Sequence, residues 1–128
     1  MTKRHIVEVD NVPASPSPIS NAVVVGNHRW ISGQLSVVSN GAYAHGTARE
    51  EAERAFANVF RIAEVAGFAR TDIVCVDLAF IDLADVTEVN VLYGELFLVG
   101  QRPARTIYQA AKLPFGGKVK VQAVAARA

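Results

Sequence analysis

The chain has 128 residues, of which 51% are hydrophobic and 20% are charged, and its formal net charge is +1. This length predicts a single domain spanning residues 1–128 that buries roughly two thirds of its unfolded surface. The near-zero charge supplies no long-range field for nucleic acid or an anionic membrane, so neither is expected as a partner. The high apolar content instead indicates additional surface buried between subunits.

The cysteine content and the first residues set the expected compartment. A single cysteine, Cys75, excludes an intramolecular disulfide, and its strand-like surroundings predict a small core residue rather than a nucleophile. The first residues lack an apolar segment long enough for a signal peptide, and no run is long enough to cross a bilayer. We therefore expect a soluble, cytoplasmic protein.

The first part of the chain predicts strands and loops. Residues 5–9 have the pattern of an edge strand, and the three prolines within 13–18 break regular structure and indicate a loop. The apolar runs 21–25 and 29–35 are separated by a Gly-Asn-His turn, which is typical of a hairpin. An irregular loop, 42–46, follows.

A well-signalled helix comes next. Thr47 and Glu50 have the spacing of a capping box, and Gly67 is a natural stop. Apolar residues recur at three- and four-residue steps between these signals and predict one buried stripe. The stripe consists of Ala52, Ala55, Phe56, Val59, Ala63 and Ala66.

A strand and a second helix follow. Residues 72–80 are apolar on both sides apart from Asp77, as expected of a central strand. Asp85 with Glu88 signals the start of the second helix, and Gly100 with Pro103 signals its end. The predicted inner face of this helix consists of Val86, Val89, Tyr93, Leu96 and Phe97.

The last part of the chain predicts a hairpin. A short strand begins after Pro103, a turn covers 114–117, and a second strand follows. Alternation in the second strand places Val119, Val121, Ala123 and Ala125 on one face and Lys120, Gln122 and Val124 on the other. The whole order predicts an α+β fold, in which two helices cover one face of a mixed sheet and the other face needs a partner.

Short motifs, in order along the chain, resemble the reactive-intermediate deaminase family, known as Rid or YjgF. The resemblance runs from roughly residue 16 to the last residues. It implies a chorismate-mutase-like fold assembled as a homotrimer, with the uncovered sheet faces packed around the threefold axis and ligand sites in clefts between subunits. The motifs are Ile31-Ser32-Gly33-Gln34, Ala57-Asn58-Val59, Ala66-Gly67-Phe68, Asp72-Ile73-Val74, Asp82-Leu83, Val89-Asn90 with Tyr93, Pro103-Ala104-Arg105-Thr106, Leu113-Pro114 and residues 119–125.

Arg105 is the strongest functional candidate. A guanidinium near the start of a strand offers a rigid fork of donors that suits a carboxylate. In the Rid family the matching arginine binds the carboxylate of a 2-imino or 2-enamino acid, which implies a small carboxylate substrate. Arg102 has no counterpart in the motif and is interpreted as a surface or rim charge.

The resemblance assigns roles to three further positions. Ser32 and Gly33 match the family segment whose serine lines the pocket, although Ser-Gly also serves at strand ends because glycine permits close backbone approach. In the family a backbone carbonyl just after the arginine holds the attacking water, and here that carbonyl belongs to Ile107.

Two positions depart from the family pattern. Gln122 stands where the resemblance implies a glutamate that activates the water; an amide can orient water but cannot carry a proton. Ile19 follows Pro18 where those deaminases have a tyrosine that contacts the substrate. His45 either replaces the missing acid-base group or is a solvated loop histidine.

The sequence has no metal-ligand spacing and no glycine-rich phosphate loop, so neither a metal nor a cofactor is expected. The resemblance implies cofactor-independent hydrolysis of 2-imino or 2-enamino acids to 2-keto acids with release of ammonia. The alternative is a non-catalytic trimer that binds small carboxylates as a sensor or partner protein. A ribonuclease is disfavoured by the low charge and the lack of a basic aromatic face.

Overall fold

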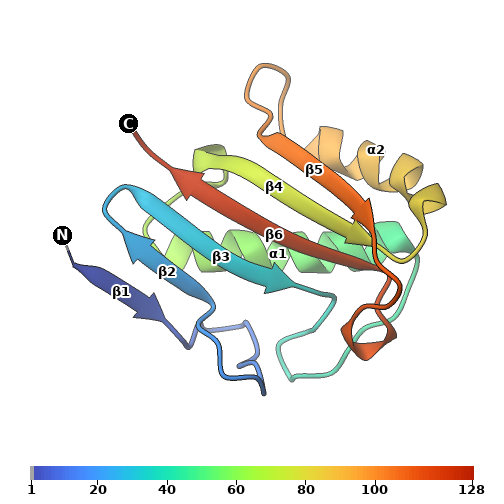
Figure 1. The fold of residues 1–128 in the computed structure, drawn as a ribbon, viewed down its shortest axis with the longest axis horizontal. Helices are drawn as coiled ribbons and strands as arrows, with labels where there is room; N and C mark the ends of the chain where they lie inside the picture. The colour runs from blue at the N-terminus through green and yellow to red at the C-terminus, as the bar shows by residue number, and fades with distance from the viewer. Residues whose placement is uncertain (1) are drawn as a thin grey trace.

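One six-stranded sheet forms the body of the structure, a computed structural model that describes residues 2–128. In space the strand order is β1-β2-β3-β6-β4-β5, with β1 and β5 at the edges (Figure 1). β4 and β5 run parallel and the other neighbours run antiparallel, so the sheet is mixed, as predicted. The strands are β1 (Lys3–Ile6), β2 (Ala22–Val25), β3 (His28–Gln34), β4 (Ile73–Phe80), β5 (Ala104–Gln109) and β6 (Val119–Ala126).

The N-terminal part of the sheet follows the prediction with one shift. β2 and β3 form the expected antiparallel hairpin. The edge strand β1 begins at Lys3 rather than at residue 5 and ends at Ile6, whereas Val9 forms an isolated bridge with Val12. The proline-rich residues 13–18 form a loop, as predicted.

The first helix, α1 (Ala48–Val65), is confirmed in detail. Thr47 and Glu50 form the expected capping box. Gly67 follows the helix with a φ of 85°, a conformation that glycine adopts without strain. The predicted apolar stripe is buried along its whole length.

The second helix, α2 (Val86–Leu96), begins with a different cap from the one predicted. The Asp85 side chain makes no capping hydrogen bond. Asp82 instead accepts a hydrogen bond from the Ala84 N–H at 2.9 Å and starts a short 3-10 turn that leads into the helix. The Asp-Glu spacing therefore located the helix but not the capping residue.

The inner face of α2 closes the core. Val89 and Tyr93 are buried, and so is Phe97, which leaves the helix with a φ of −122° and turns its ring inward. For this reason the helix ends at Leu96 rather than at Gly100. α1 and α2 lie on the same face of the sheet (Figure 1) and share one hydrophobic core with it. No helix within residues 2–128 is long and apolar enough to cross a membrane.

The predicted C-terminal hairpin is wrong, because β5 and β6 are not neighbours. β4 lies between them, parallel to β5 and antiparallel to β6. Burial explains this order. β5 has five exposed residues of six, which suits an edge, whereas β6 buries its small apolar face against α1, as its alternation predicted.

Neither helix covers the second face of the sheet, which we call the open face. Trp30, its cross-strand partner Val124 and Tyr108 share this face, and Trp30 is 52% and Tyr108 47% exposed. Cys75 also lies here and is only partly buried, so the prediction of a core cysteine was wrong. An irregularity between Ile73 and Cys75 shifts the alternation along β4.

A buried carboxylate joins three segments of the chain. Glu51 of α1 is 0% exposed and accepts hydrogen bonds from the Tyr43 hydroxyl at 2.6 Å, the Lys118 N–H at 2.9 Å and the Gly46 N–H at 3.2 Å. Burial raises the pKa of Glu51, but the hydrogen bonds lower it by a larger amount. The net pKa of Glu51 therefore lies below the usual value. Glu51 thus fixes the loop before α1 and the start of β6 against the helix.

Replacing Glu51 with Gln should destabilise the fold in a pH-dependent way. The amide keeps the shape but loses the charge and an acceptor, which should cost about 2–4 kcal/mol in the free energy of unfolding at neutral pH. Because the folded pKa is lowered, the charged form stabilises the fold above the usual glutamate pKa, and this contribution is lost as the pH falls below about 4. Urea unfolding at about pH 7 and pH 3.5 measures the difference, with exposed Glu64→Gln as the control. An equal cost at both pH values would contradict this role.

Two tyrosine-to-phenylalanine substitutions should differ in their effect on stability. The Tyr43 hydroxyl donates to Glu51, whereas the buried Tyr93 hydroxyl has no hydrogen-bond partner among the described residues. Tyr43→Phe should therefore cost about 1–3 kcal/mol of stability, and Tyr93→Phe should cost nothing or stabilise slightly. Thermal unfolding of the two variants provides the comparison, and a larger loss for Tyr93→Phe would refute it.

Candidate functional site

Arg105 lies in a hollow between β5 and α2. Arg105 pairs with the buried Val76 across the β4–β5 ladder. Its side chain therefore leaves the sheet on the helix-covered face. One guanidinium nitrogen donates to Asn90 Oδ1 at 2.9 Å, and the guanidinium carbon lies 4.7 Å from the centroid of the Tyr93 ring. The residue is exposed, but its charged group is held in place and is not a freely solvated surface charge.

We call this site the Arg105 hollow; its volume is about 400 Å³. Arg102 lines it as well, and its Nε donates to the Phe97 carbonyl at 3.0 Å, which fixes it beside the end of α2. Burial raises the pKa of Tyr93 to about 12, so its ring stays neutral at physiological pH. The lining residues are Asn90, Tyr93, Gly94, Arg102, Pro103 and Arg105.

A second hollow, of about 460 Å³, lies beside the end of β3, and we call it the Lys120 hollow. It contains Ile19 and Gly33, two of the residues expected to bind substrate. Proline and serine residues from 13–17 form one wall, and Phe115 forms part of another. Phe115 has a φ of 62°, an unfavourable backbone conformation for a bulky residue, and its ring packs 5.6 Å from that of Tyr43.

Ser32 has a structural role in this region. Its hydroxyl donates to the Ser20 carbonyl at 2.6 Å, and its N–H donates to the Asn21 carbonyl at 2.9 Å. Ser32 therefore ties the end of β3 to the preceding loop, and it does not line either hollow within the described residues. Its predicted contact with substrate stays a prediction.

The remaining candidates lie outside both hollows. Gln122 is exposed on the open face, opposite Asp77 of β4. Ile107 is a partly buried residue of β5 whose side chain packs on the core. The His45 ring lies 4.7 Å from the Tyr43 ring in the loop before α1. Within residues 2–128 of a single chain, none of these three residues lines the hollow that contains Arg105 or the hollow that contains Ile19.

Sequence reasoning missed two residues of the hollows. Asn90 belongs to the motif Val89-Asn90 with Tyr93, and its i, i+3 spacing from Tyr93 places both on one helix face, which is the available signal. Lys120 lies two residues before Gln122 on the same face of β6, and it, not Gln122, reaches the hollow that contains Ile19. The alternation of β6 put both on one face but could not say which of the two lines a hollow.

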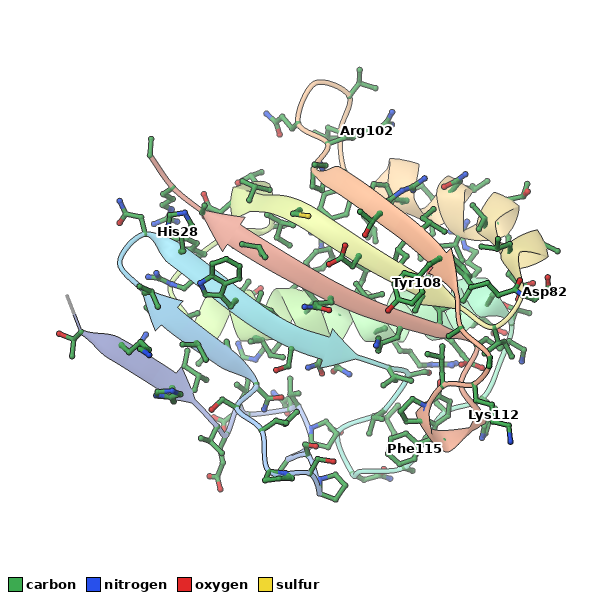
Figure 2. All side chains as sticks on the ribbon, viewed as in Figure 1. His28, Asp82, Arg102, Tyr108, Lys112 and Phe115 are labelled. Atoms are coloured by element: carbon green, nitrogen blue, oxygen red, sulfur yellow. The ribbon has the colours of Figure 1, made fainter. Side chains whose placement is uncertain are left out.

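The two hollows are separate in one chain. They share no lining residue, and β6 and β4 lie between β3 and β5. Figure 2 shows Arg102, of the Arg105 hollow, and Phe115, of the Lys120 hollow, in distant parts of the molecule. Arg105 therefore cannot act together with Ile19 and Gly33 on one small ligand within a single subunit.

Both hollows are electropositive. Arg102 and Arg105 line the first and Lys120 the second, and no aspartate or glutamate is among the lining residues of either. No group of acidic, histidine or cysteine side chains that could hold a metal ion occurs within residues 2–128. The arrangement can bind an anion, but it offers no carboxylate for proton transfer.

Comparison with known proteins agrees with this architecture. The family described as Endoribonuclease L-PSP matches residues 9–127. A 2-iminobutanoate/2-iminopropanoate deaminase from Bos taurus is 37% identical over 123 residues, which cover 95% of this chain and 89% of that protein. The structure of RidA from Psychrobacter sp. PAMC 21119 is 32% identical with a TM-score of 0.90, over 97% of this chain and 100% of that one. Escherichia coli TdcF with bound serine is 28% identical with a TM-score of 0.88, over 98% of this chain and 100% of that one.

The six-stranded mixed sheet with two helices on one face thus defines an α+β fold shared with these solved structures. The chain belongs to the Rid/YjgF/L-PSP family, as its motifs indicated. Relatives that are about as similar as the Bos taurus protein carry the same deaminase name in goat, human, rat and mouse.

Asn90 should control the binding of small carboxylates at Arg105. Asn90→Ala removes the hydrogen bond that orients the guanidinium and should weaken the binding of 2-oxobutanoate about 3- to 10-fold. Asn90→Asp should weaken it more, because the new carboxylate pairs with Arg105 and competes with the ligand. Calorimetric titration measures both, and an affinity that is unchanged in the two variants would contradict this role.

Proposed function

We propose that this chain is a cofactor-independent imine/enamine deaminase, which hydrolyses reactive 2-imino or 2-enamino acids to 2-keto acids and releases ammonia. The observation that carries the proposal is Arg105, held by Asn90 and the Tyr93 ring in a hollow without acidic residues. Such a guanidinium is suited to a bidentate contact with the substrate carboxylate. The deaminase name of the Bos taurus relative and the serine bound to Escherichia coli TdcF support a small carboxylate ligand.

We infer that the working unit is a homotrimer with its sites between subunits. Arg105 of one subunit would then face Ile19, Ser32 and Gly33 of the next. Two observations support this: Arg105 lies in one hollow and Ile19 and Gly33 in another that a single chain keeps apart, and the open face exposes Trp30 and other apolar side chains. A sheet face of this kind is typical of a subunit contact.

The reaction demands little proton transfer from the protein. Water adds to the carbon of the protonated imine and gives a carbinolamine, which collapses to the keto acid and ammonia. The oxygen of the water becomes the keto oxygen, and both of its hydrogens leave with the nitrogen. We propose that the backbone carbonyl of Ile107 accepts a hydrogen bond from the attacking water. Gln122 is a candidate for orienting this water when a neighbouring subunit brings the ligand to the open face. Positioning of this kind lowers a barrier by several kcal/mol.

A non-catalytic carboxylate-binding protein is the second candidate. The observation in its favour is that no acidic residue lines either hollow, so that neither contains an evident acid-base group of the usual carboxylate kind. A ribonuclease, the activity in the family's description, is not proposed, because a net charge of +1 gives little attraction for a phosphate backbone.

Arg105→Ala should abolish most of the deaminase activity. Loss of two charge-assisted hydrogen bonds to the carboxylate should lower kcat/KM by about 100-fold or more. Arg105→Lys keeps the positive charge but loses the planar pair of N–H donors, so it should retain only part of the wild-type activity. The assay generates 2-iminobutanoate in situ with an amino-acid oxidase and follows its hydrolysis. Arg4→Ala, on the opposite edge strand β1, is the matched control and should be unaffected.

Mixing two inactive variants tests whether the site lies between subunits. Arg105→Ala and Gly33→Leu, unfolded and refolded together, should regain up to about a quarter of the activity, because some interfaces then contain no altered residue. Wild-type hydrolysis no faster than buffer for several imino acids would exclude the enzyme. Saturable binding of 2-keto acids that depends on Arg105 would then identify the binding protein.

A further inference from the structure

Lys120 is the only charged residue among the sixteen that line the Lys120 hollow. Its backbone is fixed in the central strand β6, opposite Ala79 of β4. Its side chain runs along Gly33: a Cβ at Gly33 would lie 3.1 Å from Lys120 Cδ and 3.6 Å from Cε. The missing side chain at Gly33 therefore makes room for the aliphatic part of the lysine, and Lys120 is one of the residues that line the hollow.

The ammonium has no competing partner in the part of the chain that the structure describes. No salt bridge or hydrogen bond of Lys120 occurs there, in contrast to Lys118, which pairs with Glu51. Two side-chain amides that line the hollow already donate hydrogen bonds within the chain. Asn58 donates to two backbone carbonyls, and Asn21 donates to the Val7 carbonyl. The charge of Lys120 is thus left for a ligand.

The walls around this charge are mostly apolar. Ile19 is 48% and Phe115 57% exposed, and both line the hollow together with Pro16. Short methylene segments pack on such walls, whereas the ammonium requires an anion. The hollow therefore fits an aliphatic chain that ends in a carboxylate.

We propose that Lys120 determines substrate specificity by binding a second carboxylate, so that the preferred substrates are 2-imino acids with a carboxylate on the side chain. The inference rests on the proposed function: Arg105 of one subunit holds the carboxylate next to the imine, and Lys120 of the adjoining subunit holds the distal one. Ile19 and Phe115 contact the methylene groups between them. Lys120 acts here as a specificity-determining residue and takes no part in the addition of water.

The test compares dicarboxylic and monocarboxylic substrates in the same assay. The dicarboxylic 2-iminosuccinate and 2-iminoglutarate and the monocarboxylic 2-iminobutanoate are generated in situ by amino-acid oxidases. The intact protein should hydrolyse the dicarboxylic acids with the higher kcat/KM. Lys120→Gln should lower the ratio of kcat/KM for dicarboxylic over monocarboxylic acids by at least about tenfold, and Lys120→Glu should lower it further by repulsion.

Lys112→Gln is the matched control, because Lys112 is an exposed lysine of the segment between β5 and β6 (Figure 2) and does not line the Lys120 hollow. It should leave the ratio unchanged. A ratio that is the same in the intact protein, Lys120→Gln and Lys120→Glu overturns the proposal.

Binding separates a failure of this inference from a failure of the proposed function. When no imino acid is hydrolysed, the affinities for 2-oxoglutarate and 2-oxobutanoate are compared by calorimetry. The specificity role is supported, although catalysis is absent, when the two variants differ. Lys120→Gln should then weaken the binding of 2-oxoglutarate alone, whereas Arg105→Ala should weaken the binding of both acids. Equal affinities of Lys120→Gln and the intact protein for 2-oxoglutarate overturn it.

Discussion

The insertion of β6 between β3 and β4 is the constraint on which the rest of the structure depends. It is the only strand that joins the N-terminal hairpin to the β4–β5 pair within the described residues. The buried face of β6 packs against α1 in the core, and its other face carries Lys120 and Gln122. Glu51 fixes its beginning by accepting the Lys118 N–H. A carboxylate with no solvent exposure thus helps to position Lys120, which lies in β6 two residues after Lys118.

The elements that depend on local signals could be predicted from the sequence, and those that depend on distant contacts could not. α1 followed from its capping box and apolar stripe, because both are properties of neighbouring residues. The pairing of β6 with β3 and β4 is a long-range choice, set by which strand can bury a small apolar face against α1, and two adjacent strand patterns suggested a hairpin instead. Cys75 was predicted to be a core residue because its apolar surroundings are typical of a strand buried on both faces, and the sequence does not reveal that one face of β4 is left uncovered by the helices.

The same division applies to the candidate site. The motif around Arg105 identified the guanidinium from sequence, but its contact with Asn90 requires β5 to lie beside α2. Alternation put Lys120 and Gln122 on one face, and only the position of the loop 13–19 and of Phe115 decides which of them reaches a hollow. Gln122 lies instead opposite Asp77, whose carboxylate accepts a hydrogen bond from the Thr106 hydroxyl, in a polar row across the open face. The separation of the two hollows is a property of the sheet order, which no short motif encodes.

The charges of the hollows connect the proposed assembly with the proposed ligand. Each hollow contains at least one cationic side chain and no carboxylate among its lining residues. Subunits that bring Arg105 and Lys120 to one cleft bring like charges together and remove water from them, which opposes association until an anion occupies the cleft. A ligand with one carboxylate compensates one of these charges, and a ligand with two compensates both. Since a ligand that binds only the assembled form stabilises it by mass action, the proposed dicarboxylic ligand would also be the better stabiliser of the proposed trimer.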